Sequence, residues 1–154
     1  MKARTIVLAL LTCVIGLTIC FAEDAVIGTW KLNESKSKIS PGTTKNTNVV
    51  YQAAGDDVKV TADGVGADGN PTHVEWTGKL DGKDYPVTGD PNSDMRSYKK
   101  VNDHTLEFTA KKGSKVTTTG HIVVSADGKT RTVNTNGTDS TGKAFHNTAV
   151  YDKQ

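Results

Sequence analysis

The stretch V-I-G-T-W-K-L-N at residues 26–33 opens the part of the chain that is built from short apolar segments. On a strand, side chains two positions apart share a face, so Val26, Gly28, Trp30 and Leu32 point the same way. A buried tryptophan removes ~150–250 Å² from water, worth roughly 4–6 kcal/mol at most. We therefore predict that Trp30 sets the inner face, and that Gly28 lets a second backbone or ring come close. Both residues are assigned structural roles.

Alternating segments separated by turn residues continue from there to the end of the chain. The clearest covers residues 72–80, where Val74, Trp76 and Leu80 alternate with polar side chains. About ten such segments at this spacing predict an all-β fold, a single antiparallel up-and-down barrel, with a flattened sandwich as the alternative. We interpret the four Asp-Gly pairs as hairpin turns whose glycines have positive φ. The pairs begin at Asp63, Asp68, Asp81 and Asp127.

Alternation also predicts which side chains face the interior of the barrel. His73, His121 and His146 fall on outward faces, as do Glu75 and Glu107. The inward set is apolar and aromatic, and either fills the barrel or lines a cavity. Besides Trp30, it comprises Val49, Tyr51, Val58, Val60, Val74, Trp76, Leu80, Tyr85, Val87, Leu106, Phe108, Ile122, Val124, Val133, Phe145 and Tyr151.

The first 22 residues have the layout of a cleaved secretory signal peptide. Lys2 and Arg4 precede an apolar run over 6–21, and Ala22 is a small residue at the expected cleavage site. The run is short for a membrane span, so no stable membrane insertion is expected after cleavage. We predict an exported protein, periplasmic or extracellular, whose single domain covers residues 23–154.

Both cysteines, Cys13 and Cys20, lie in this segment, so the mature domain is predicted to lack disulfides and cysteine metal sites. Ile19 precedes Cys20 where a lipoprotein would carry a small residue, which makes a lipid tether at Cys20 the less favoured alternative. Of the 19 Lys and Arg, two lie in the signal, which leaves 17 against 17 Asp and Glu. This neutral balance argues against nucleic acid as a partner. We expect a monomer.

Catalytic patterns are missing from the sequence. The four histidines have no metal-ligand spacing, and there is no nucleophile elbow and no glycine-rich phosphate loop before a helix. The prediction is a non-enzymatic protein with no cofactor and no metal site.

Two stretches resemble known proteins. G-T-W-K-L at 28–32 is similar to the opening of fatty-acid-binding proteins and of the wider lipocalin-like (calycin) superfamily, and A-V-Y-D-K at 149–153 resembles their last strand. The whole chain resembles small exported bacterial proteins of unassigned function, which share G-T-W-K-L-N, K-S-K, D-G-K-D-Y-P-V-T-G and S-A-D-G-K-T-R-T, here at 28–33, 36–38, 81–89 and 125–132.

The resemblance implies a calycin-like barrel that binds a small apolar or amphiphilic molecule. Fatty-acid-binding proteins carry a helical pair after their first strand, but residues 34–46 are short and contain Pro41-Gly42, so we predict no helical lid. The family grips a carboxylate with an Arg-x-Tyr in the last strand. The matching positions here are Ala149 and Tyr151, so the tyrosine carries over and the arginine does not.

Arg131 is the one cation that alternation places inside, on the face of Val133. An unpaired buried charge costs several kcal/mol, so this residue needs a partner or a rim position. Three interpretations remain open. Arg131 covers Trp30 by a cation–π contact, as a late arginine commonly does in lipocalin-like folds, or it binds an anionic head group, or a register error leaves it exposed.

The predicted ligand site consists of Tyr51, Trp76, Arg131 and Tyr151, with Arg131 in place of the arginine missing at Ala149. It predicts a ligand with one anionic head and an apolar body. The alternative function is an envelope interaction or inhibitor module with a filled barrel that acts through its loops. An internal cavity of roughly 300 Å³ or more would favour the binding protein over the module.

Overall fold

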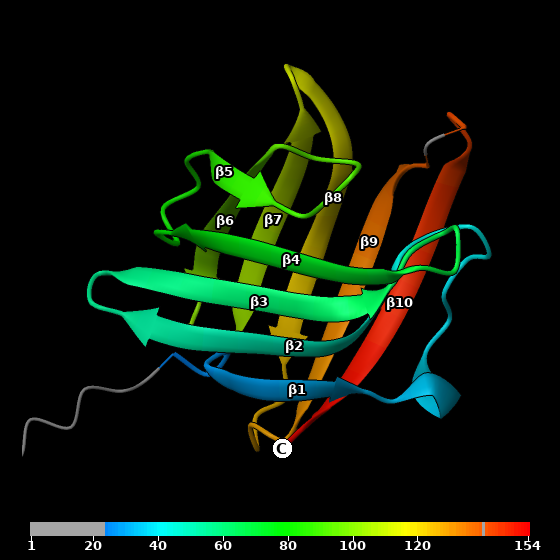
Figure 1. The fold of residues 1–154 in the computed structure, drawn as a ribbon. Helices are drawn as coiled ribbons and strands as arrows, with labels where there is room; N and C mark the ends of the chain where they lie inside the picture. Colours follow the sequence, from blue (N-terminus) through cyan, green and yellow to red (C-terminus); the bar gives the residue numbers. More distant parts are fainter. Residues whose placement is uncertain (1–23, 140) are drawn as a thin grey trace, which may run out of the picture.

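The computed structural model of the chain describes residues 24–139 and 141–154, so the predicted signal segment at 1–22 lies outside the described residues. Ten antiparallel strands form one closed barrel (Figure 1). The strands are β1 (Gly28–Leu32), β2 (Lys45–Ala54), β3 (Asp57–Val65), β4 (Pro71–Gly78), β5 (Tyr85–Thr88), β6 (Met95–Asn102), β7 (Thr105–Lys112), β8 (Lys115–Val124), β9 (Thr130–Thr138) and β10 (Ala144–Lys153).

Each strand pairs with its neighbours in the chain, and β1 closes the barrel by pairing with β10. The predicted all-β barrel is confirmed, and closure excludes the flattened sandwich. Between β1 and β2 the chain makes only the 3₁₀ turn η1 (Glu34–Lys36), and the described residues contain no α-helix, which confirms the absence of a helical lid. Within the same residues, no helix has the length and apolar character needed to cross a membrane.

The period-2 alternation correctly predicts which faces are buried. In β4, Val74 and Trp76 are buried while His73 and Thr77 are exposed. The predicted inward residues are buried or partly buried throughout, the partly buried ones being Leu80, Tyr85, Phe108, Val133 and Phe145.

One predicted turn is wrong. Asp63-Gly64 lies inside β3, which continues to Val65. Gly64 is required there because β2 carries an irregularity between Asn46 and Asn48 that pushes the two backbones together. A Cβ at Gly64 would lie 2.2 Å from the carbonyl oxygen of Lys45, so the glycine permits a close approach and makes no turn. The other three Asp-Gly pairs do have glycines with positive φ.

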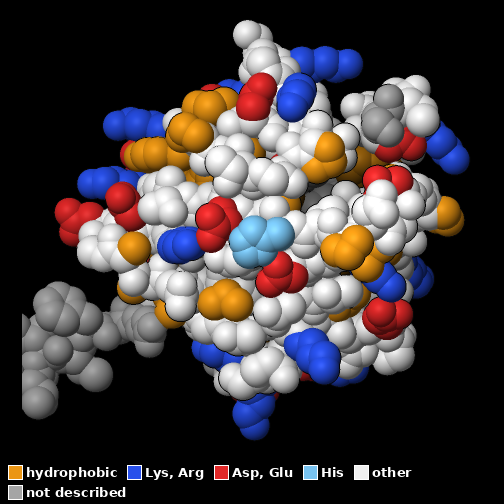
Figure 2. Space-filling view, in the orientation of Figure 1, with side chains coloured by type: hydrophobic (Ala, Val, Ile, Leu, Met, Phe, Trp, Pro, Cys, Tyr) orange, Lys and Arg blue, Asp and Glu red, His pale blue; other side chains and the backbone are white. Residues whose placement is uncertain are grey.

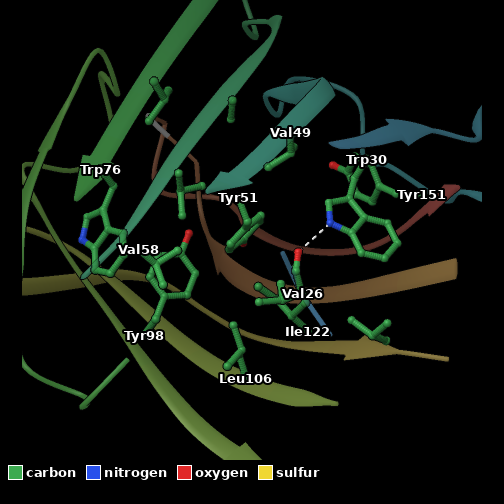
Figure 3. Packing of buried hydrophobic residues seen from close by; sticks show 14 of the residues in the cluster. Val26, Trp30, Val49, Tyr51, Val58, Trp76, Tyr98, Leu106, Ile122 and Tyr151 are labelled. Atoms are coloured by element: carbon green, nitrogen blue, oxygen red, sulfur yellow. Dashed lines mark hydrogen bonds between the residues drawn. The ribbon is translucent and has the colours of Figure 1, made fainter. Parts of the chain in front are cut away.

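Loops that follow odd-numbered strands lie at one end of the barrel, which we call the open end, and those that follow even-numbered strands lie at the other, the closed end. The closed end is sealed by Trp30, which is completely buried and donates a hydrogen bond from Nε1 to the Val26 carbonyl oxygen, 2.7 Å (Figure 3). Gly28, at φ 132°, leaves room for Lys153, whose Cε would lie 2.7 Å from an added Cβ. Trp30 and Gly28 therefore sit where the first strand meets the last.

Candidate functional site

The barrel encloses a cavity of about 190 Å³ that reaches the surface at the open end, where Figure 2 shows a recess. Its walls are apolar and aromatic, and its mouth is lined mainly by hydroxyl and amide side chains. Wall residues include Val49, Val60, Val74, Phe108, Ile122 and Val133, and mouth residues include Thr43, Asn46, Thr72, Asn92, Thr118 and Thr138.

The size of this cavity limits what it can hold. It is below the roughly 300 Å³ at which pockets for drug-sized ligands begin, so the volume expected for a binding protein is not reached. It exceeds the ~150 Å³ of an engineered apolar cavity that takes up benzene. The interior is therefore not filled by side chains, and an occupant has to be small.

Arg131 lies deep in this cavity, with only 2% of its surface exposed. It is the second residue of β9 and lies directly opposite Tyr151 of β10. Its guanidinium carbon is 4.4 Å from the ring centre of Tyr151, 5.1 Å from that of Tyr51 and 5.3 Å from that of Trp30. Three aromatic rings therefore surround the Arg131 guanidinium. This burial excludes the interpretation in which Arg131 is exposed.

This cation has no acidic partner. Within residues 24–139 and 141–154 no ion pair involves Arg131, and its Nε and Nη1 have no hydrogen-bond partner. Cation–π contacts are worth about 0.5–2 kcal/mol each, whereas burying a charge costs several kcal/mol. The rings therefore offset only part of the cost, and two N–H donors are left free to bind an anion.

The two tyrosines beside Arg131 stay protonated. Burial raises the pKa of Tyr51 far above its ordinary value, and burial also raises the pKa of Tyr151, although Arg131 opposes that shift. The Tyr151 hydroxyl donates to the Asn46 carbonyl oxygen at 3.1 Å. Its ring thus extends from the guanidinium of Arg131 to the start of β2, and gives the cavity one rigid wall.

Of the four predicted ligand residues, the structure brings Tyr51, Arg131 and Tyr151 together around the cavity and places Trp76 outside its lining. Trp76 packs edge-on against Tyr98, with ring centres 4.7 Å apart, and its Nε1 donates to the Arg96 carbonyl oxygen at 2.9 Å. Figure 3 shows Trp76 and Trp30 on opposite sides of the cluster, with Tyr51 and Tyr98 between them. Trp76 therefore packs against Tyr98, which lines the cavity in its place.

A second inward cation, Arg96, corrects the prediction that Arg131 is the only one. Arg96 lines the cavity from β6 and pairs with Asp90 of the β5–β6 loop, 2.8 Å between Nη2 and Oδ2. Burial disfavours its charged form, but the neighbouring Tyr98 and Asp90 outweigh this and raise its pKa. Arg96 and Tyr98 stand in M-R-S-Y-K-K-V-N, where no apolar alternation marks the inner face. The only sequence pattern was their two-residue spacing.

Unpaired buried polar atoms concentrate at this cavity. Among the described residues, the buried side-chain atoms without a hydrogen-bond partner are Asn46 Oδ1, Thr72 Oγ1, Arg96 Nε, and Nε and Nη1 of Arg131. All four residues line the cavity. Buried polar groups in proteins are normally paired, and each exception calls for an explanation.

Three of the histidines lie on the outer face of the barrel. His73, His121 and His146 are exposed, as alternation predicted. In the part of the chain that the structure describes, no group of three or more His, Cys, Asp or Glu side chains is placed to hold a metal ion.

Fold and site together define a closed ten-stranded antiparallel β-barrel with a small, partly charged cavity. A Schistosoma mansoni fatty acid binding protein in complex with arachidonic acid matches with a TM-score of 0.58 and 18% identity, over 84% of this chain and 96% of that one. A redesigned β-barrel, mFAP1, bound to DFHBI matches with a TM-score of 0.44 and 18% identity, over 84% and 95%. The first likeness confirms the predicted fold. No protein-family profile and no curated protein matches in sequence.

Proposed function

We propose that this protein is a non-enzymatic, exported binding protein that holds one small amphiphilic molecule inside its barrel. The observation that carries the proposal is the buried Arg131, whose Nε and Nη1 have no hydrogen-bond partner and which pairs with no carboxylate among the described residues. A ligand with one anionic group would pair with these donors, and its apolar body would contact the walls.

The arrangement also orients the ligand. Arg131 lies toward the closed end, beside Trp30, while the mouth is at the open end. The anionic group therefore enters first. The alternative module with a filled barrel has less support, because the interior contains a cavity of about 190 Å³. Export is part of the proposal and rests on the signal-like segment at residues 1–22.

Native mass spectrometry of the protein isolated from its own source tests the proposal. Expected is one small molecule per chain, released on denaturation and detected as an anion. The protein stripped of this molecule should bind 3-phenylpropionate, an acid with a ring-sized apolar body, at one site. An empty protein that also fails to bind this acid would contradict the proposal.

A further inference from the structure

The mouth of the cavity contains three unpaired polar atoms besides those of Arg131. They are Asn46 Oδ1 near the start of β2, Thr72 Oγ1 near the start of β4, and Arg96 Nε near the start of β6. Each of these strands begins at the open end, whereas Arg131 is near the start of β9, at the closed end. The cavity thus has one polar group at its base and a separate polar set near its mouth.

Asn46 and Thr72 are placed together by the sheet. Asn46 pairs with Gly64 of β3, and Gly64 pairs with Thr72 of β4, so the three form one row across the barrel wall. Gly64 has no side chain, so the β2 backbone at Lys45 and Asn46 packs closely against β3 at this point. We call this row the Asn46–Thr72 notch. It lines the cavity from the side of the mouth.

The side chain of Tyr151 spans the distance between the notch and the Arg131 guanidinium. The Tyr151 ring contacts the Arg131 guanidinium, and its hydroxyl donates to the backbone of Asn46. A ligand that reaches both Arg131 and the notch therefore needs an apolar body of about the length of a ring. The cavity volume, somewhat larger than one that takes up benzene, agrees with that size.

The unpaired atoms near the mouth also indicate which chemical group the ligand carries there. Asn46 Oδ1 is an acceptor, Arg96 Nε–H is a donor, and the Thr72 hydroxyl is either. A hydroxyl group on the ligand both donates and accepts, so it can pair with any of them. A plain hydrocarbon end would leave all three unpaired in a buried site, which is unfavourable.

We infer that the ligand is a compact oxygenated organic acid, with its carboxylate at Arg131 and a hydroxyl group at the Asn46–Thr72 notch. This inference rests on the proposed function and adds the substrate class to it. It favours a hydroxylated ring-sized acid over a long unsubstituted fatty acid.

The test compares two acids that differ by one hydroxyl, 3-(4-hydroxyphenyl)propionate and 3-phenylpropionate, by calorimetric titration. The wild-type protein should bind the hydroxylated acid about 3- to 10-fold more tightly, the range for one hydrogen bond. Thr72→Val keeps the shape and removes the hydroxyl, and should reduce this preference to less than about 2-fold. The preference should shrink without any loss of affinity for 3-phenylpropionate, because the variant no longer buries an unpaired hydroxyl beside the unsubstituted ring.

Thr77→Val is the matched control, because Thr77 is on the same strand but exposed on the outer face. It should keep the full preference. If the wild type binds both acids equally, or if Thr72→Val keeps the preference, the notch does not recognise the hydroxyl group of the ligand. The inference is then wrong, while the proposed function stands. If neither acid binds, the inference is wrong, and the proposed function is wrong with it when native mass spectrometry also finds the isolated protein empty.

Discussion

Replacing Arg131 with methionine separates a ligand-binding arginine from a structural one. Methionine has a similar length and is apolar, so it fills the same space without the charge. The substitution removes three cation–π contacts, each worth about 0.5–2 kcal/mol, whose guanidinium-to-ring distances are 4.4, 5.1 and 5.3 Å. It also removes a desolvation cost of several kcal/mol that no carboxylate offsets.

Because the rings offset only part of the desolvation cost, the free energy of unfolding of ligand-free Arg131→Met should be no lower than that of wild type by more than about 1 kcal/mol, and is expected to be higher. Binding of an anion should suffer much more. Loss of a charge-assisted hydrogen bond costs about 1.5–3 kcal/mol, which is roughly a 10- to 150-fold weaker affinity for 3-phenylpropionate. The uncharged propylbenzene, which has no group that can pair with Arg131, should lose no affinity.

The assay is chemical denaturation for stability and calorimetric titration of both ligands for selectivity. Lys153→Met is the matched control, because Lys153 Nζ lies 5.3 Å from the same Trp30 ring but is exposed and does not line the cavity. It should leave both ligands unaffected. The reasoning is refuted if Arg131→Met loses more than about 2 kcal/mol of stability, the upper value for one cation–π contact, and weakens the charged and neutral ligands alike.

Three further changes test other parts of the structure. Ala110→Phe places a ring in the cavity wall and should abolish binding of 3-phenylpropionate in a titration, while the circular dichroism spectrum stays that of a β-barrel. Gly64→Ala brings a Cβ to 2.2 Å from the Lys45 carbonyl oxygen and should cost about 1–3 kcal/mol in a denaturant titration; an unchanged midpoint would contradict the close packing there. His73 donates a hydrogen bond from Nδ1 to the Asp63 carboxylate at 2.6 Å, and this hydrogen bond raises the pKa of His73. Its contribution to stability is therefore present below about pH 6.5 and lost as pH rises through the raised value, so the Tm of His73→Gln should depend less on pH over this range than that of wild type.

The fold was predictable because its inner face is marked by large apolar residues at two-residue spacing. Trp30 and Trp76 set the registers of their own strands, and a one-residue slip in either would expose a whole face. The closure of the barrel followed from the number of strands and from the resemblance at both ends of the domain. Turn residues were a weaker guide, since Gly64 follows an aspartate as a hairpin glycine does but serves a close contact between strands.

The site was predictable only in part. Arg131 and Tyr151 line the cavity, and their inward positions were predictable because alternation and the resemblance agreed on them. Arg96 and Tyr98 were missed, because their strand has no apolar pattern and its inner face becomes clear only from its pairing with β7. Trp76 faces inward as predicted, but Tyr98 stands between it and the cavity, a contact between strands far apart in the sequence.

The two ends of the barrel domain lie at the same pole, opposite the mouth. The backbone N–H of Gln154 donates to the Thr29 carbonyl oxygen at 3.0 Å, and Asp24 forms an ion pair with Lys100 at the closed-end terminus of β6. A support, a fusion partner or a fluorescent reporter attached at either end would thus leave the entrance clear. Joining the two ends through a short linker and opening the chain at a closed-end hairpin would give a permuted barrel whose entrance loops are all retained.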